Sequence, residues 1–169
     1  MFTLYIVRHG EAEGNVQRVL QGQTPGRLTP AGIEQARRVA ALLTDTAVDV
    51  FVSSDQQRAV DTCRILAAPH PQASIATTPL LRERDWGDFT GRNIDEVQGL
   101  PFPDNVETLP QLMARAQQFL DEMEAHHKGQ TVVAVSHGIM LKALQAVFYN
   151  KKMHEVEKMA NAEVRCLQR

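Results

Sequence analysis

Two histidines in this chain each lie between a short apolar segment and a glycine. His9 follows the segment 3–8, and His137 follows the segment 131–136. Apolar, β-branched segments of this length are typical of buried parallel strands, whose carboxyl ends carry the ligand-binding residues in open α/β sheets. Both imidazoles are therefore predicted to lie at one edge of a sheet, where a neutral ring can act as a nucleophile or a base.

Two arginines are predicted to lie at the same edge. Arg8 precedes His9, and Arg58 falls in the first turn of the helix expected after the segment 48–54. Two guanidinium groups and two imidazoles in one pocket repel one another unless an anion is bound. A dianionic phosphate is the natural ligand, because its oxygens accept paired hydrogen bonds from guanidinium groups and from N–H groups at helix ends. The first hypothesis is therefore chemistry on a phosphate group.

Strand and helix patterns alternate along the chain, which predicts an α/β fold with a mostly parallel central sheet between two helical layers. The expected strands cover residues 3–8, 48–54, 73–78, 131–135 and 162–167. The expected helices cover residues 30–43, 58–67, 108–128 and 138–148. Thr29 and Thr108 are the expected N-caps, and the apolar stripe of the first helix includes Ile33. The irregular segment of about 84–107 is interpreted as a cover over the site within a single domain of residues 1–169.

Composition narrows the class of protein. A chain of 169 residues can bury a sizeable core without a disulfide or a metal. A net charge of −2 and a pI near 6.3 argue against a nucleic-acid or membrane partner, so a small solute is expected. Cys63 and Cys166 lie far apart and indicate reduced thiols in a cytoplasmic protein. Neither a signal peptide nor an apolar stretch of about 18 to 20 residues is found, and a homodimer is left open.

The motifs of this chain resemble those of the histidine phosphatase superfamily, specifically its phosphoglycerate-mutase-like branch. The resemblance extends in order over nearly the whole chain. It is carried by Arg8-His9-Gly10-Glu11 with Asn15 and Gln21-Gly22, by 28–36, by 53–62, by Leu81-Arg82-Glu83 with Gly87 and Gly91, and by Val135-Ser136-His137-Gly138. It implies a three-layer α/β/α sandwich of the phosphoglycerate mutase type.

The resemblance also implies roles for single residues. His9 would be the nucleophile, kept neutral by Arg8 and Arg58, and a protonated His137 would stabilise charge on the transferring group with the two arginines. Glu83 would be the general acid and base. The implied substrate-binding residues are Arg8, Asn15, Gln21, Gly22, Arg58, Glu83, His137 and Gly138.

Other interpretations of the acid and of the histidines are weighed beside these roles. Burial next to Trp86 would keep Glu83 protonated, whereas an ion pair with Arg82 or Arg84 would remove it from catalysis, and Asp85 is a nearby competitor. A metal site formed by Glu83 and the two site histidines is disfavoured because the arginines would oppose a cation. His126 and His127 are better explained as an exposed helix end. No cofactor and no metal are expected.

Departures from the family pattern bear on the reaction. The segment 91–107 is short and lacks the paired arginines with which mutases hold a carboxylate, Phe89-Thr90-Gly91 lacks the usual acid, and Val106-Glu107-Thr108 replaces a Gly-Glu-Ser pattern. An open pocket admits water. The sequence therefore favours a metal-independent phosphatase acting on a small phosphorylated metabolite through a phosphohistidine. The alternatives are a phosphoglycerate mutase and a catalytically idle phospho-ligand binder.

Overall fold

The computed structural model describes residues 2–168 and contains a five-stranded sheet in the order β3-β2-β4-β1-β5. The strands are β1 (Thr3–Arg8), β2 (Val50–Ser54), β3 (Ser74–Thr78), β4 (Thr131–Ser136) and β5 (Val164–Leu167). Four strands are parallel, and β5 runs antiparallel to β1 at one edge. The predicted mostly parallel sheet is confirmed.

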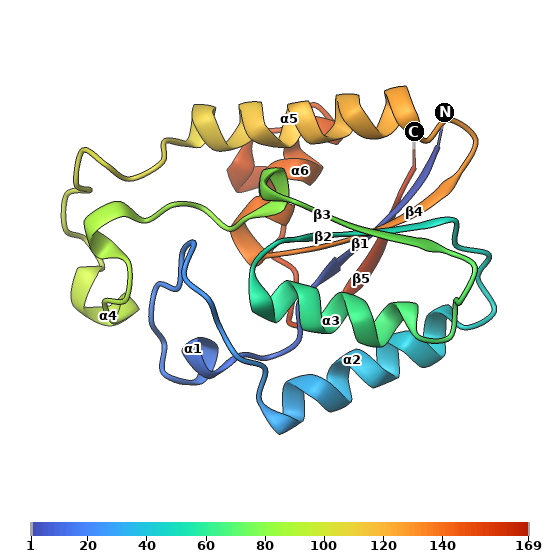
Figure 1. Cartoon of the computed structure of the whole chain (residues 1–169). Coiled ribbons are helices and arrows are strands. Elements are labelled where there is room, and N and C mark those ends of the chain that lie inside the picture. Colours follow the sequence, from blue (N-terminus) through green and yellow to red (C-terminus); the bar gives the residue numbers. More distant parts are fainter. Residues whose placement is uncertain (1, 169) are drawn as a thin grey trace.

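Helices cover both faces of this sheet (Figure 1). The helices α2 (Pro30–Leu43) and α3 (Gln57–Ala67) lie on one face, and α5 (Leu109–His126) and α6 (Gly138–Phe148) lie on the other. The fold is therefore the predicted three-layer α/β/α sandwich. Among residues 2–168, no helix is long and apolar enough to cross a membrane.

The central strands are buried on both faces, which explains their nearly continuous apolar sequences. In β1, Leu4 and Ile6 belong to the core cluster beneath α5 and α6, whereas Val7 belongs to the cluster beneath α2 and α3. The side chains of β4 divide between the two clusters in the same alternating way. The two cores therefore hold β1 and β4 side by side. This pairing places the residues that follow the two strands, His9 and His137.

Both predicted N-caps are confirmed. Thr29 Oγ1 accepts a hydrogen bond from the backbone N–H of Gly32 at 3.0 Å, with proline at the first helical position. Thr108 forms a capping box with Gln111 at the start of α5. Such caps satisfy N–H groups that have no partner inside the helix.

Three details of the prediction are wrong. Ile33 is only partly buried rather than part of the core stripe of α2. Strand β2 begins at Val50 rather than at residue 48, and the side chain of Asp49 before it accepts the backbone N–H of Thr131. Strand β5 begins at Val164, because Ala162 has a left-handed φ of 56°, which an extended strand cannot contain.

The segment expected to cover the site is irregular, as predicted, but it contains short helical turns. These are η1 (Pro79–Leu81), η2 (Gly87–Phe89) and α4 (Ile94–Val97), and a further turn, η3 (Met153–Glu155), follows α6. The Arg18–Asp95 ion pair and the bridge between Val19 and Asn93 join the segment to the chain just after α1 (Glu13–Val16). Figure 1 shows α1 and α4 beyond the same end of the sheet, opposite the two termini.

Candidate active site

The pairing of β1 with β4 brings the two predicted histidines together. Arg8 pairs with Ser136 across the two strands, so His9 and His137 both lie one residue beyond that pair. Their ring centroids are 5.1 Å apart at an interplanar angle of 61°. Both side chains are buried. The prediction that two imidazoles meet at one sheet edge is confirmed.

The hydrogen bond of His9 defines its tautomer. Nδ1 lies 2.7 Å from the carbonyl oxygen of Gly10, and a carbonyl oxygen can only accept, so Nδ1 carries the proton. The lone pair of the neutral ring is therefore on Nε2. Burial, followed by the positive charge of Arg58, lowers the pKa of His9 from 6.5 to about 3, with a smaller contribution from Arg8. Near neutral pH His9 is therefore a neutral imidazole with its lone pair on Nε2.

His137 differs from the expectation that it is protonated. Burial lowers its pKa well below 6.5, and the nearby His9 and Arg58 lower it further. Its Nε2 lies 2.9 Å from Ser54 Oγ, and its buried Nδ1 has no partner within residues 2–168. In the free protein His137 is therefore neutral. It can still donate a hydrogen bond from Nδ1, provided that the Ser54 hydroxyl donates to Nε2.

Arg58 is held by the backbone of the loop before α2. Its Nη1 donates to the carbonyl oxygen of Thr24 at 2.7 Å, and its Nη2 donates to that of Gly22 at 2.9 Å. Gly22 has a φ of +52°, a conformation that favours glycine, and this turn directs its carbonyl toward the guanidinium. Burial lowers the pKa of Arg58 to about 10 despite the opposing charge of Glu83, so the group stays charged.

Arg8 is held in a similar way from another part of the chain. Its Nη1 donates to the carbonyl oxygen of Met159 at 2.8 Å. Of the buried side-chain nitrogens without a partner in residues 2–168, four in all, three belong to this site: Nε of Arg8, Nε of Arg58 and Nδ1 of His137. A buried donor without an acceptor is unfavourable, so the site is suited to a ligand rich in acceptors.

Glu83 is oriented by backbone N–H groups at the start of α6. Its carboxylate oxygens accept from the N–H groups of Ile139 and Met140 at 3.2 and 3.1 Å, and its own N–H donates to the Gln56 side chain. The carboxylate also accepts from the backbone N–H of Arg84 at 2.8 Å. The first turn of the helix that follows His137 thus holds the carboxyl group of Glu83.

The neighbours of Glu83 have other partners. Arg82 pairs with Asp55, so its guanidinium is not available to Glu83. The Arg84 guanidinium donates to the carbonyl oxygen of Glu107 and lies 4.7 Å from the centre of the Trp86 ring. The competing acid Asp85 is exposed and accepts the N–H of Gly87. The Trp86 ring packs against the Arg84 guanidinium and the Phe102 ring, and no hydrogen bond joins it to Glu83 within residues 2–168.

Asn15 is oriented by a residue that the sequence did not single out. Asn15 Oδ1 accepts from the N–H of Ala12 at 2.9 Å and from Asn161 Nδ2 at 3.3 Å. Asn161 Nδ2 also donates to the carbonyl oxygen of His9 at 3.1 Å. Because its oxygen is occupied twice, Asn15 has only its NH₂ group to offer to a ligand.

The other two predicted binding residues lie close to the arginines. The side chain of Gln21 fills the space between Gly14 and Gly26, next to Arg58. A methyl group added at Gly138 would lie 3.3 Å from Arg8 Cζ, so Gly138 borders the guanidinium of Arg8. All predicted site residues therefore gather around the carboxyl ends of β1 and β4.

Four residues of this site were not predicted. Ser54 ends β2, so the same strand-edge rule that found the histidines could have found it. Met159, Asn161 and Lys158 lie in the irregular stretch before β5, where no periodic pattern indicates which way a side chain points.

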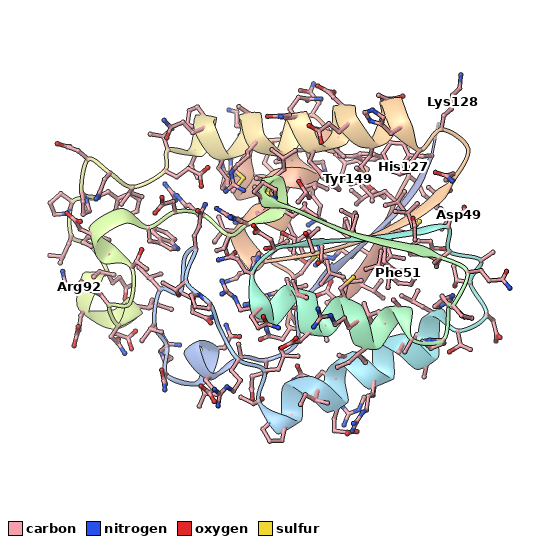
Figure 2. The ribbon with its side chains drawn as sticks, in the orientation of Figure 1. Asp49, Phe51, Arg92, His127, Lys128 and Tyr149 are labelled. Atoms are coloured by element: carbon pink, nitrogen blue, oxygen red, sulfur yellow. The ribbon has the colours of Figure 1, made fainter. Side chains whose placement is uncertain are left out.

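Other places in the molecule compete poorly as sites. No group of three or more His, Cys, Asp or Glu side chains in residues 2–168 could hold a metal ion. A cavity of about 690 Å³ is lined by Phe2 and Phe148 among others and contains none of the site residues. Figure 2 shows His127 and Lys128 at the end of α5 near Asp49, far from Arg92 on the segment beyond the other end of the sheet.

Comparisons with known proteins show similarity in both sequence and fold. The family model described as the histidine phosphatase superfamily (branch 1) matches residues 4–169. The chain is 31% identical to phosphoglycerate mutase-like protein 4 of Arabidopsis thaliana, over 95% of this chain and 76% of that protein. It is 32% identical to the Bacillus subtilis protein named uncharacterized phosphatase PhoE, over 85% and 76%. A mycobacterial glucosyl-3-phosphoglycerate phosphatase in complex with VO₃ superimposes with a TM-score of 0.91 at 26% identity, covering 98% and 92%.

Proposed function

Because this chain belongs to the histidine phosphatase superfamily (branch 1), we propose that it hydrolyses small phosphomonoesters through a phosphohistidine on His9. The observation that carries the proposal is a set of three buried nitrogens without partners in residues 2–168, two guanidinium N–H groups and Nδ1 of His137, around a histidine whose Nε2 bears a lone pair. The oxygens of a phosphoryl group can hydrogen-bond to all three nitrogens, and its phosphorus is the electrophile for His9 Nε2. The reaction needs no metal, because guanidinium groups supply the positive charge.

In the first step, His9 Nε2 attacks phosphorus while the bond from phosphorus to the ester oxygen breaks. The proton on Nδ1 stays in place, and the Gly10 carbonyl oxygen stabilises the positive charge that the ring gains. Glu83, in its protonated form, transfers its proton to the leaving oxygen. The products are a phosphohistidine, an alcohol and the Glu83 carboxylate.

The phosphoryl oxygens are stabilised by the fixed donors of the site. The Nε–H groups of Arg8 and Arg58 and the Nδ1–H of a neutral His137 each have a hydrogen bond to give. Asn15 adds its NH₂ group, and Gln21 lies beside Arg58 at the mouth. Because these donors are already oriented, little reorganisation is needed as charge develops on the oxygens.

In the second step, water attacks the phosphohistidine. The Glu83 carboxylate takes a proton from the water, and the bond between His9 Nε2 and phosphorus breaks. Inorganic phosphate leaves, His9 is again neutral, and Glu83 is again protonated. The same carboxyl group thus serves as acid and then as base.

The test is to trap the intermediate. Wild-type protein quenched during turnover of p-nitrophenyl phosphate should carry acid-labile, base-stable phosphate on the peptide that contains His9. The His9→Asn variant should carry none and should lose at least about 10³-fold of the activity. Full activity in that variant, or turnover without any trapped phosphate in wild type, would overturn the proposal.

Phosphoglycerate mutase activity is the second candidate, since the Arabidopsis relative is named mutase-like. We favour hydrolysis because the segment 91–107 has no arginine pair to hold a second anionic end during transfer. A coupled assay with a bisphosphorylated primer separates the two reactions. The idle-binder alternative is disfavoured because His9 and Glu83 are both present and oriented.

The cellular compartment, the partners and the oligomeric state of the enzyme are also proposals. The free thiols of Cys63 and Cys166 support a reducing compartment such as the cytoplasm. We propose that the chain acts as a single catalytic domain on a small phosphorylated metabolite, with neither nucleic acid nor membrane as partner. Gel filtration with light scattering tests whether it forms a homodimer.

A further inference from the structure

Lys158 lies at the edge of the proposed active site, in the stretch between η3 and β5. A methyl group added at Gly138 would lie 2.8 Å from Lys158 Cε and 3.3 Å from Arg8 Cζ, so the lysine and the arginine flank the same point. The residue after the lysine, Met159, holds Arg8 through its carbonyl oxygen. The backbone that fixes Arg8 therefore also fixes the base of the Lys158 side chain.

The Lys158 ammonium has no partner of its own. No hydrogen bond or ion pair joins it to another side chain or carbonyl in residues 2–168. Lys158 is exposed, and the surrounding protein still shields its ammonium from water enough to lower its pKa; the like charge of Arg8 lowers the pKa further, and Glu83 opposes this change. The Glu83 carboxylate offsets part of the repulsion between this ammonium and the Arg8 guanidinium, and a substrate anion bound beside them would offset more of it.

The transferring phosphoryl group does not need this charge. Donors from Arg8, Arg58 and His137 are already available for its oxygens. Lys158 lies instead beside the first residue of α6, the helix whose Ile139 and Met140 N–H groups hold the Glu83 carboxylate. The charge of Glu83 also acts on Lys158, so the lysine lies near the group that would protonate the leaving oxygen, and hence on the side of the leaving group.

We propose that Lys158 is a specificity-determining residue that binds a second anionic group, a carboxylate or a further phosphate, on the leaving group of the substrate. The preferred substrates are then phosphomonoesters that carry a second negative charge within reach of the lysine. The lysine takes no part in the bond changes. This inference rests on the proposed function, because it uses Glu83 to place the leaving group.

The test compares two esters that differ in one group. 3-Phosphoglycerate and glycerol 3-phosphate have the same three-carbon skeleton, with a carboxylate in one where the other has a hydroxymethyl group. In Lys158→Met, kcat/KM should fall about tenfold for the carboxylate ester and less than about twofold for the other, as expected for one charge-assisted hydrogen bond. Lys158→Arg should retain most of the preference, and Lys128→Met, at the far end of α5, is the matched control.

A second pair of esters distinguishes the sources of the charge. Fructose 1,6-bisphosphate and fructose 6-phosphate repeat the comparison with a phosphate as the second anion. If Lys158→Met lowers kcat/KM only for the ester with the second anion, in either pair, the result supports the proposal and identifies that anion. Equal losses for both members would place Lys158 on the transferring phosphoryl group instead, and no loss for any ester would remove it from the site. Either result overturns the proposal.

Binding measurements separate this proposal from the proposed function. In the His9→Asn background no turnover is expected, so calorimetry can report the affinity for each ester directly. Lys158→Met in that background should weaken only the doubly charged esters. This result would support the lysine's role even if phosphohistidine were never trapped, whereas equal affinity with and without Lys158 would overturn it.

Discussion

Burial among positive charges keeps His9 neutral, and this has a consequence for stability. The pKa of His9 is about 3 in the folded protein and 6.5 in an unfolded chain. Between these values the unfolded chain binds a proton that the folded protein does not, so acid favours unfolding. The stability associated with neutral His9 is complete above about pH 6.5 and is lost as the pH falls toward 3.

This gives a prediction for the free protein. Between pH 7 and pH 5 the free energy of unfolding should fall about 2 kcal/mol more in wild type than in His9→Asn. Asparagine can keep the hydrogen bond to the Gly10 carbonyl oxygen and does not titrate. Urea unfolding of both proteins at both pH values measures the difference. The same pH dependence in the two proteins would show that His9 does not resist protonation.

Asn161 is expected to act by orienting Asn15. In Asn161→Asp, the carboxylate would face Asn15 Oδ1, so the Asn15 amide should turn and present its oxygen to the phosphate. KM should then rise about fivefold with a smaller change in kcat. This corresponds to a coupling free energy of about 1 kcal/mol between Asn161 and Asn15 in substrate binding. Steady-state kinetics in wild-type and Asn15→Ala backgrounds measure it. The effect should vanish without Asn15; an unchanged effect there would contradict the positioning role.

At the scale of single elements, the start of α6 does two things at once. Gly138 leaves room for Arg8, and the next two N–H groups hold the Glu83 carboxylate. The N-terminal end of a helix carries a partial positive charge that favours a carboxylate. One helix start thus joins His137, Arg8 and Glu83 in a fixed arrangement.

A general acid at this position predicts a dependence on the leaving group. In Glu83→Gln, kcat/KM for glycerol 3-phosphate should fall by about 10² to 10⁴, because an alkoxide leaves poorly without a proton. The fall should be much smaller for p-nitrophenyl phosphate, whose phenolate leaves unaided. Thermal melting of the variant checks that it is folded. Equal falls for both substrates would exclude Glu83 as the acid in the first step.

At the scale of the whole molecule, Arg115 on α5 holds together the two ends of the segment 80–107. Its guanidinium donates to both carboxylate oxygens of Glu107 and to the carbonyl oxygens of Leu80, Arg82 and Glu83. The side chains of the ion pair are 16% and 12% exposed. Both ends of the segment that carries Glu83 are thus fixed by one side chain from a distant helix.

Removing this side chain should destabilise the protein. Arg115→Met should lower the free energy of unfolding by about 3 kcal/mol, because it leaves a mostly buried carboxylate without its charged partner and the carbonyl oxygens of Leu80 and Arg82 without a donor. Arg37→Met is the matched control, since its ion pair with Glu34 is exposed, and it should cost less than about 1 kcal/mol. Urea unfolding measures both, and similar losses would contradict the role assigned to Arg115.

Local patterns in the sequence were sufficient for the sheet, the main helices and their caps. Alternating buried residues in β1 and β4 and threonine caps at Thr29 and Thr108 report environments that are decided within a few residues. The same patterns placed both histidines at strand ends. Irregular backbone carries no such signal, which is why β5 was expected to begin at Ala162 and why Asn161 was missed.

The sequence by itself determined which residues reach the carboxyl edge of the sheet, because strand periodicity and chain order place them there. Only the tertiary structure decided what they meet: the pairing of His137 with Ser54, the support of Asn15 by Asn161 and the nearness of Lys158 to Arg8. It also decided that burial and the neighbouring positive charges lower the pKa of His137 in the free protein, which opposes the protonated form expected from the sequence. These contacts join residues 83 to 150 positions apart, and their distances and electrostatic effects depend on strand register and shared burial, which no local segment contains.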